Sequence, residues 1–119
     1  EWLQHERRFA IVTRNWLSPR DRRDEIDLVC RDGEVLVFVE VKARAAGALV
    51  SGFHAVDRRK KRVLRRVIAA YLAKLTEKPR TFRFDVVEIS LAGGPGQPVP
   101  PPEIRHFENV PLFSKHFRP

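Results

Sequence analysis

Residues 25–42 read EIDLVCRDGEVLVFVEVK, and this stretch decides the fold. Its second half, residues 35–42, is rich in β-branched and aromatic residues, which predicts a strand. Its first half, residues 25–30, alternates polar and apolar residues, as half-buried strands do. Asp32 and Gly33 lie between the halves, and an Asp-Gly pair at that place predicts a hairpin with these two residues as its loop.

Four charged side chains fall on one face of this predicted hairpin. Side chains alternate between the two faces of a strand, so Glu40 and Lys42 share a face and the valines of the same strand occupy the other. With the two-residue loop, Glu25 lies opposite Glu40, and Asp27 is a diagonal neighbour at about 7–8 Å. A divalent cation can bridge carboxylates at that spacing and would relieve the like-charge Glu25–Glu40 pair. The pattern therefore indicates a metal site of the kind that cleaves phosphodiesters.

The opposite face of the hairpin is predicted to be buried, with Ile26, Leu28 and Cys30 beside the valines. A longer turn, or a register slip by one residue, is the alternative, and it would leave the acids on a solvated sheet edge. Cys30 is the one cysteine of the chain, which excludes a disulfide within it and a cysteine zinc site. We expect a protein of the reducing cytoplasm.

The composition indicates a single globular domain over residues 1–119. Hydrophobic residues make up 43% of the chain, which argues against disorder, and no apolar run approaches the length of a membrane span. The sequence begins at Glu1 and not at methionine, so we expect a longer N-terminal helix to precede it. The first residues of the chain, Trp2 to Glu6, are predicted to be the end of that helix.

The formal net charge of +8 predicts a polyanionic partner. Nucleic acid is favoured over a membrane surface, and a generic basic protein remains the alternative. The acids converge on one predicted spot while the cations spread around it. A nuclease needs this layout, because cations hold the nucleic-acid backbone while acids hold the metal.

Residues 54–75 are predicted to form a long helix, because apolar residues recur there at helical spacing. Lys60 falls inside the apolar stripe, so we expect it to point toward the sheet near the acids, or to reach water along its aliphatic stem. Four arginines fall on the opposite face, where they are solvated or contact phosphate: Arg58, Arg62, Arg65 and Arg66.

The remaining elements are expected in a fixed order. Strands are predicted over residues 9–13, 82–89 and 104–107, loops over 14–24, 43–52 and 93–102, and a final segment, 110–113, that packs on the core. This order predicts an α/β fold with a mixed sheet flanked by helices. The four histidines show no mutual ligand spacing and are expected in surface or loop positions: His5, His54, His106 and His116.

Asp27 followed by Glu40-Val41-Lys42 resembles the D-x(n)-E-x-K signature of the PD-(D/E)XK nuclease superfamily. The whole chain is similar to the YraN-type UPF0102 family, described as endonuclease-like and related in fold to archaeal Holliday-junction resolvases. The matching stretches span the chain in order: 14–16, 25–28, 37–42, 55–60, 71–72, 83–87 and 104–113. The resemblance implies a restriction-endonuclease-like αβββαβ core.

The resemblance also implies residue roles. Asp27, Glu40 and the main-chain carbonyl of Val41 would bind Mg²⁺ or Mn²⁺, and Lys42 would position the attacking water or stabilise charge on the phosphorane. Glu25 and Lys60 match further residues of the family's site. One departure is Asp24, which stands where the family has glycine and adds another acid to this stretch. Another is a family glutamate that would precede Glu1.

Three functions are compatible with the sequence. The leading hypothesis is an endonuclease that hydrolyses branched or single-stranded DNA, with Asp27, Glu40, Lys42, Glu25 and Lys60 as catalytic residues. The second is a module with a nuclease fold that binds nucleic acid without cutting it. The third is a structural or regulatory partner of another basic-groove protein, acting as a dimer with residues 110–113 as its interface rather than as core. We assign nucleic-acid contacts to five cations: Arg44, Arg58, Arg59, Lys61 and Arg62.

Overall fold

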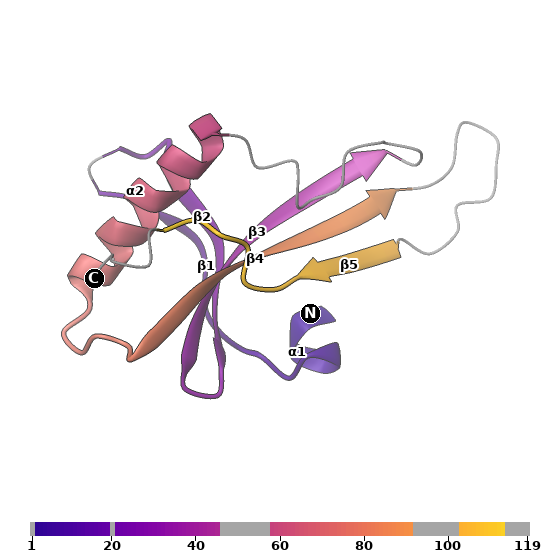
Figure 1. The fold of residues 1–119 in the computed structure, drawn as a ribbon, viewed down its shortest axis with the longest axis horizontal. Helices are drawn as coiled ribbons and strands as arrows, with labels where there is room; N and C mark the ends of the chain where they lie inside the picture. The colour runs from indigo at the N-terminus through magenta and orange to yellow at the C-terminus, as the bar shows by residue number, and fades with distance from the viewer. Residues whose placement is uncertain (1, 20, 46–57, 92–102, 114–119) are drawn as a thin grey trace.

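The computed structural model describes residues 2–19, 21–45, 58–91 and 103–113 (Figure 1). These residues form an α/β domain with a mixed sheet, which confirms the predicted class. The fold is consistent with a restriction-endonuclease-like core. The elements in chain order are α1 (Trp2–Glu6), β1 (Ala10–Leu17), β2 (Glu25–Asp32), β3 (Val35–Ala45), α2 (Arg58–Lys74), β4 (Thr81–Leu91) and β5 (Glu103–Phe107).

The five strands form one sheet in the order β1-β2-β3-β4-β5. β3 and β4 are parallel, whereas the other neighbouring pairs are antiparallel. Parallel neighbours need a long crossover, and here α2 lies between β3 and β4 in the chain. α2 lies across one face of the sheet (Figure 1). The helix therefore covers the face on which Glu40 was expected.

The β2–β3 hairpin is confirmed, but its register differs from the predicted one by two residues. Asp32 pairs with Val35, so the loop consists of Gly33 and Glu34. Gly33 has φ of +62°, and a primed hairpin turn needs a positive φ at its first central residue, which glycine provides without strain. A shift by two residues keeps the paired side chains, Leu28–Asp32 and Val35–Val39, on their predicted faces.

Apolar side chains form two layers, one on each face of the sheet. The layer under α2 contains Phe38, Leu64 and Ile68, and the layer on the α1 face contains Leu3, Phe9, Val37 and Val39. Cys30 is buried on the α1 face, as expected. Ile26 is an exception: it packs in the layer under α2, because it pairs with Trp16, which packs against that layer.

Several predicted boundaries are wrong. Residues 14–17 were expected in a loop and belong to β1, which pairs with β2 as far as Leu17. Residues 43–45 likewise extend β3. Pairing with a neighbouring strand decides these boundaries, and local composition does not show it. The expected loop at 93–102, the rest of the loop at 46–52 and the helix start at 54–57 lie outside the described residues.

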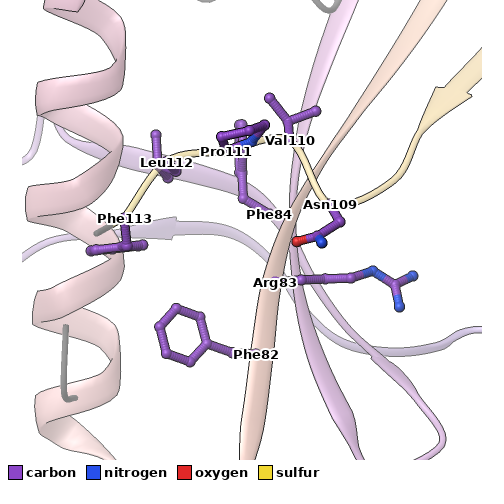
Figure 2. Close-up of a pocket in the computed structure, with 8 residues that line it drawn as sticks. All are labelled: Phe82, Arg83, Phe84, Asn109, Val110, Pro111, Leu112 and Phe113. Carbon is purple, nitrogen blue, oxygen red and sulfur yellow. The ribbon is translucent and has the colours of Figure 1, made fainter. Parts of the chain in front are cut away.

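The segment after β5 packs on the core, as predicted, and it lies between β4 and α2 (Figure 2). The Val110 N–H donates to the Phe84 carbonyl at 2.7 Å. Arg65 of α2 donates to the Leu112 carbonyl at 3.2 Å. The rings of Phe82 and Phe113 meet edge to face at 5.5 Å. These contacts join the last described residues to both the sheet and the helix.

Within the described ranges, no helix is both long enough and apolar enough to cross a membrane.

Candidate active site

Glu40 lies near the end of β3, on the face that α2 covers, and only 4% of its surface is exposed. Two lysines contact the same oxygen of its carboxylate. Lys42 Nζ lies 3.2 Å from Glu40 Oε1, and Lys60 Nζ lies 3.4 Å from it. Lys42 is on the same strand face, whereas Lys60 reaches over from the first turn of α2. The apolar-stripe position of Lys60 in the sequence is explained by this contact.

The pKa of Glu40 is raised above that of an ordinary glutamate. Burial is the largest cause, because it disfavours the charged form, and the negative charge of Asp27 adds to it. Lys60 and Lys42 oppose this shift through their positive charges. The site thus keeps two carboxylates close together in a poorly solvated place, where a further cation would stabilise both.

Asp27 is fixed by the backbone of β3. Its Oδ2 accepts a hydrogen bond of 2.8 Å from the N–H of Val41. Regular pairing of β2 with β3 stops at Leu28 and Val39, so the Asp27 side chain replaces a ladder hydrogen bond where the strands part. The N–H and C=O of one strand residue point to the same side. The Val41 carbonyl therefore points to the β2 side of β3, toward Asp27.

Glu25 does not lie opposite Glu40, and that part of the prediction is wrong. Continuing the observed register beyond Leu28 and Val39 places Asp27 opposite Glu40. Glu25 is half-buried at the start of β2, where it pairs with Leu17 of β1. Among the described residues, no group of three or more histidine, cysteine, aspartate or glutamate side chains is placed to hold a metal ion. The structure thus brings together Asp27, Glu40, Lys42 and Lys60, with Glu25 further along the same strand.

The cations assigned to nucleic acid lie mostly on the first turns of α2. Arg58, Arg59 and Arg62 are exposed, and Lys61 is half-buried. Arg44 belongs to β3, and its side chain lies outside the described part of the structure. The other two outer arginines of the helix are used within the protein. Arg65 binds the Leu112 carbonyl, and Arg66 binds the carboxylate of Asp24.

Sequence reasoning missed one acid beside the site. Glu88 of β4 is only 5% exposed and pairs with Lys42 across the parallel β3–β4 ladder. Neighbouring strands lie about 4.8 Å apart, so Glu88 borders the site on the side away from Asp27. In the sequence, Glu88 alternates with Phe84 and Val86, which indicates that all three lie on the face under α2. The register against β3 is not a local property of either strand, and it is what places Glu88 beside Lys42.

A second polar cluster lies on the other face of the sheet, around the fully buried Asp85. His106 Nε2 lies 2.7 Å from Asp85 Oδ2, Arg83 Nε donates to Oδ1 at 2.9 Å, and the Asn109 N–H donates to Oδ1 at 2.9 Å. The His106 side chain is fully buried and meets the Phe9 ring edge to face at 5.6 Å. The prediction of a surface or loop position for His106 is therefore wrong, because its carboxylate partner comes from another strand.

One hollow beside the sheet has no carboxylate in its described lining. A cavity of about 210 Å³ lies beside the segment after β5, between Phe82 and Leu112 (Figure 2). Its described lining contains Arg83 and Asn109 but no acid. The carboxylates that suit catalysis thus lie elsewhere, at the end of β3.

Comparison with known proteins identifies the family. The family profile described as "Uncharacterised protein family UPF0102" matches residues 1–89. A UPF0102 protein of Frankia alni is 43% identical over 101 residues, covering 85% of this chain and 78% of its own. One from Beutenbergia cavernae is 46% identical over 88 residues, covering 74% and 71%. One from Anaeromyxobacter dehalogenans is 42% identical over 109 residues, covering 89% and 72%.

Proposed function

We propose that this chain, which belongs to the UPF0102 family, is a metal-dependent endonuclease that hydrolyses phosphodiester bonds in DNA. One observation carries the proposal. The buried carboxylate of Glu40 lies beside Asp27 and has two lysines at one of its oxygens. A buried acid beside a half-buried one costs free energy unless cations compensate their charges. The arrangement is explained by a site built for a metal ion and a phosphate group.

The donor atoms fit a hard divalent cation. Asp27 and Glu40 would hold it with their carboxylates, and Val41 would add its carbonyl, which points to the side of Asp27. Oxygen-only ligands favour Mg²⁺ or Mn²⁺, and Mg²⁺ usually keeps several waters, so few protein ligands suffice. When bound, such an ion polarises the phosphoryl oxygen and lowers the pKa of a coordinated water.

The lysines and arginines of the chain have separate tasks in this proposal. Lys42, about a third exposed, faces the place where the phosphate would lie and stabilises the negative charge that develops there. Lys60 compensates Glu40 from the helix side. Glu25 lies two residues before Asp27, at the start of β2. The exposed cations of α2 hold the nucleic-acid backbone.

A module that binds nucleic acid without cutting it is the second candidate. The observation that favours it is that the described residues supply only two close acids, without a third ligand side chain. This candidate predicts binding that weakens steeply with salt, survives in Asp27→Asn, and yields no products with any metal.

A cleavage assay separates the two candidates. Labelled single-stranded, duplex, flap and four-way-junction DNA would be incubated with Mg²⁺, Mn²⁺ or EDTA, using the wild type, Asp27→Asn and Glu34→Gln. Glu34 is an exposed acid in the hairpin loop, so it is a matched control for the loss of one carboxylate. We expect metal-dependent products from the wild type and Glu34→Gln, and none from Asp27→Asn. Equal cleavage by all three would falsify the nuclease assignment.

A further inference from the structure

A charged hollow lies between the loop before β2 and the first half of α2. Its volume is about 360 Å³. The described residues that line it are mostly arginines and aspartates, together with Val63: Asp21, Arg23, Asp24, Arg59, Arg62 and Arg66. We call it the arginine cleft. None of the residues proposed for catalysis belongs to its lining.

The walls of the arginine cleft are held by an ion pair between the buried Asp24 and the exposed Arg66. Asp24 is only 4% exposed, and Arg66 Nε and Nη2 donate to its two carboxylate oxygens at 2.6 and 2.8 Å. The backbone of Asp24 is fixed as well, because its carbonyl accepts from the Ser18 N–H and its N–H donates to the Asp21 carbonyl. Asp24 therefore joins the loop to α2 rather than adding an acid to the metal site. The cleft is formed before any ligand arrives.

The arginine cleft carries an excess of positive charge. Four guanidinium groups and two carboxylates line it. Arg66 is paired with Asp24, and Arg23 is paired with Asp21 at 3.0 Å. Arg59 and Arg62 are exposed, and neither has a carboxylate partner within the described ranges. These two cations are therefore left for a ligand.

We propose that the arginine cleft is a phosphate-binding subsite that holds the backbone of the nucleic-acid substrate next to the Glu40 site. Guanidinium groups present planar forks of donors that match the oxygens of a phosphate, and they are weakly hydrated. The inference rests on the proposed function, because the cleft would hold the nucleic-acid strand that the Glu40 site cleaves. The proposal adds Arg23 and Arg66 to the cations assigned to nucleic acid. It also explains Asp24, which holds Arg66 in the wall of the cleft.

The position of the cleft suits an anchor for the scissile strand. On α2, Arg59 and Arg62 line the cleft, whereas Lys60 between them contacts Glu40. On β2 and its preceding loop, Asp24 lines the cleft, whereas Asp27 contacts Val41. The same two segments thus build both sites. A phosphate held in the cleft would place the neighbouring part of the strand at the carboxylates.

The test is a salt titration of DNA binding in EDTA, where no cleavage occurs. Labelled single-stranded and duplex DNA would be titrated with the wild type, with Arg59→Gln/Arg62→Gln and with Arg31→Gln/Arg80→Gln. Both double variants replace exposed arginines and lower the net charge by two. Arg31 and Arg80 lie at the hairpin end of the sheet, away from Glu40. Inorganic phosphate would be added as a competitor in a parallel series.

We expect the cleft variant to bind about tenfold more weakly at low salt, and its slope of log K against log salt to fall by about one for each lost phosphate contact. The slope of the Arg31→Gln/Arg80→Gln variant should differ from the wild-type slope by less than about half of the change seen in the cleft variant. Equal losses in the two variants would overturn the proposal, because net charge alone would then explain them. Absence of salt-sensitive DNA binding in the wild type would overturn it too.

The two proposals fail in different ways. If the slope falls only in the cleft variant but the wild type yields no products with any metal, the cleft stands and the nuclease assignment fails. If the wild type cleaves DNA and both double variants bind alike, the nuclease stands and the cleft fails. Strong competition by inorganic phosphate together with unchanged DNA binding in the cleft variant would assign the cleft to a free anion and also overturn the proposal.

Discussion

Two buried carboxylates on opposite faces of the same sheet have different surroundings, and their pKa values shift in opposite directions. Glu40, under α2, has two lysines at its Oε1 and a second acid nearby, and its pKa is raised. Asp85, on the α1 face, receives directed bonds from His106, Arg83 and the Asn109 N–H. Burial raises the pKa of Asp85, but these bonds outweigh it and the net shift is downward.

The difference separates a structural acid from an acid available for chemistry. The bonds to Asp85 join β4, β5 and the segment after β5, so this carboxylate stabilises the fold as an anion. The lysines at Glu40 are about one third exposed and have long flexible stems, so they can move when another cation binds. Four predictions break or sharpen this contrast, in order of decreasing effect.

Glu40→Gln should lower cleavage about 10³-fold, because it removes a metal-binding and charge-stabilising group. Its free energy of unfolding should change by less than about 1 kcal/mol, since the lost charge was poorly solvated. Cleavage kinetics and urea unfolding measure the two quantities. A stability loss as large as that of the Asp85 variant below would remove the contrast.

Asp85→Asn should lower the free energy of unfolding by about 3–5 kcal/mol, because it leaves Arg83 and His106 without their buried anion. Glu108→Gln is the matched control. Glu108 is about half exposed and its carboxylate lies 4.0 Å from the same Arg83 guanidinium, so its loss should cost less than about 1 kcal/mol. Urea unfolding of the two variants decides the matter, and equal values would show that the cluster does not stabilise the fold.

The two lysines at Glu40 should differ in effect. We expect Lys42→Gln to lower kcat about 10²-fold, because Lys42 lies on the same strand as Glu40 and would face the phosphate of the substrate. Lys60→Gln should lower it about tenfold, because it acts on Glu40 from the helix side. Lys61→Gln, one residue further along α2, is the control and should change KM more than kcat. Equal kcat losses for Lys42→Gln and Lys61→Gln would exclude a catalytic role particular to Lys42.

The stabilising effect of Asp85 should disappear in acid. Its pKa is lower in the folded protein, so between the folded pKa and the ordinary value near 4 the unfolded chain binds more protons, and stability rises with pH. The difference in unfolding free energy between wild type and Asp85→Asn should therefore be full above about pH 5 and shrink as the pH falls below about 4. Each unit of pKa difference corresponds to about 1.4 kcal/mol. Urea unfolding at several pH values checks this, and a constant difference would contradict it.

The sequence predicts this fold well where local pattern decides it. The Asp32-Gly33 signal located the hairpin, and the two-residue error in register left Asp27 and Glu40 on the correct face. The helical period likewise placed Lys60 toward the sheet. The direction of the Lys60 side chain could be predicted because the apolar stripe of α2 is nearly continuous.

Contacts between distant segments were beyond the sequence. Glu88 is beside Lys42 because β3 and β4 are in parallel register, and His106 is buried because β5 brings it to Asp85. Asp24 looked like an extra acid of the site, and its pairing with Arg66 shows a different role. In each case the partner lies more than fifteen residues away, where no local periodicity operates.

The hydrogen bond from the Val41 N–H to Asp27 has a practical consequence for spectroscopy. It ties a backbone amide directly to an acid of the candidate site. Titrating the ¹⁵N-labelled protein with Mg²⁺ should therefore move the Val41 amide resonance more than those of residues deeper in β3, and Asp27→Asn should abolish that response. One amide signal would then report occupancy without DNA and without turnover.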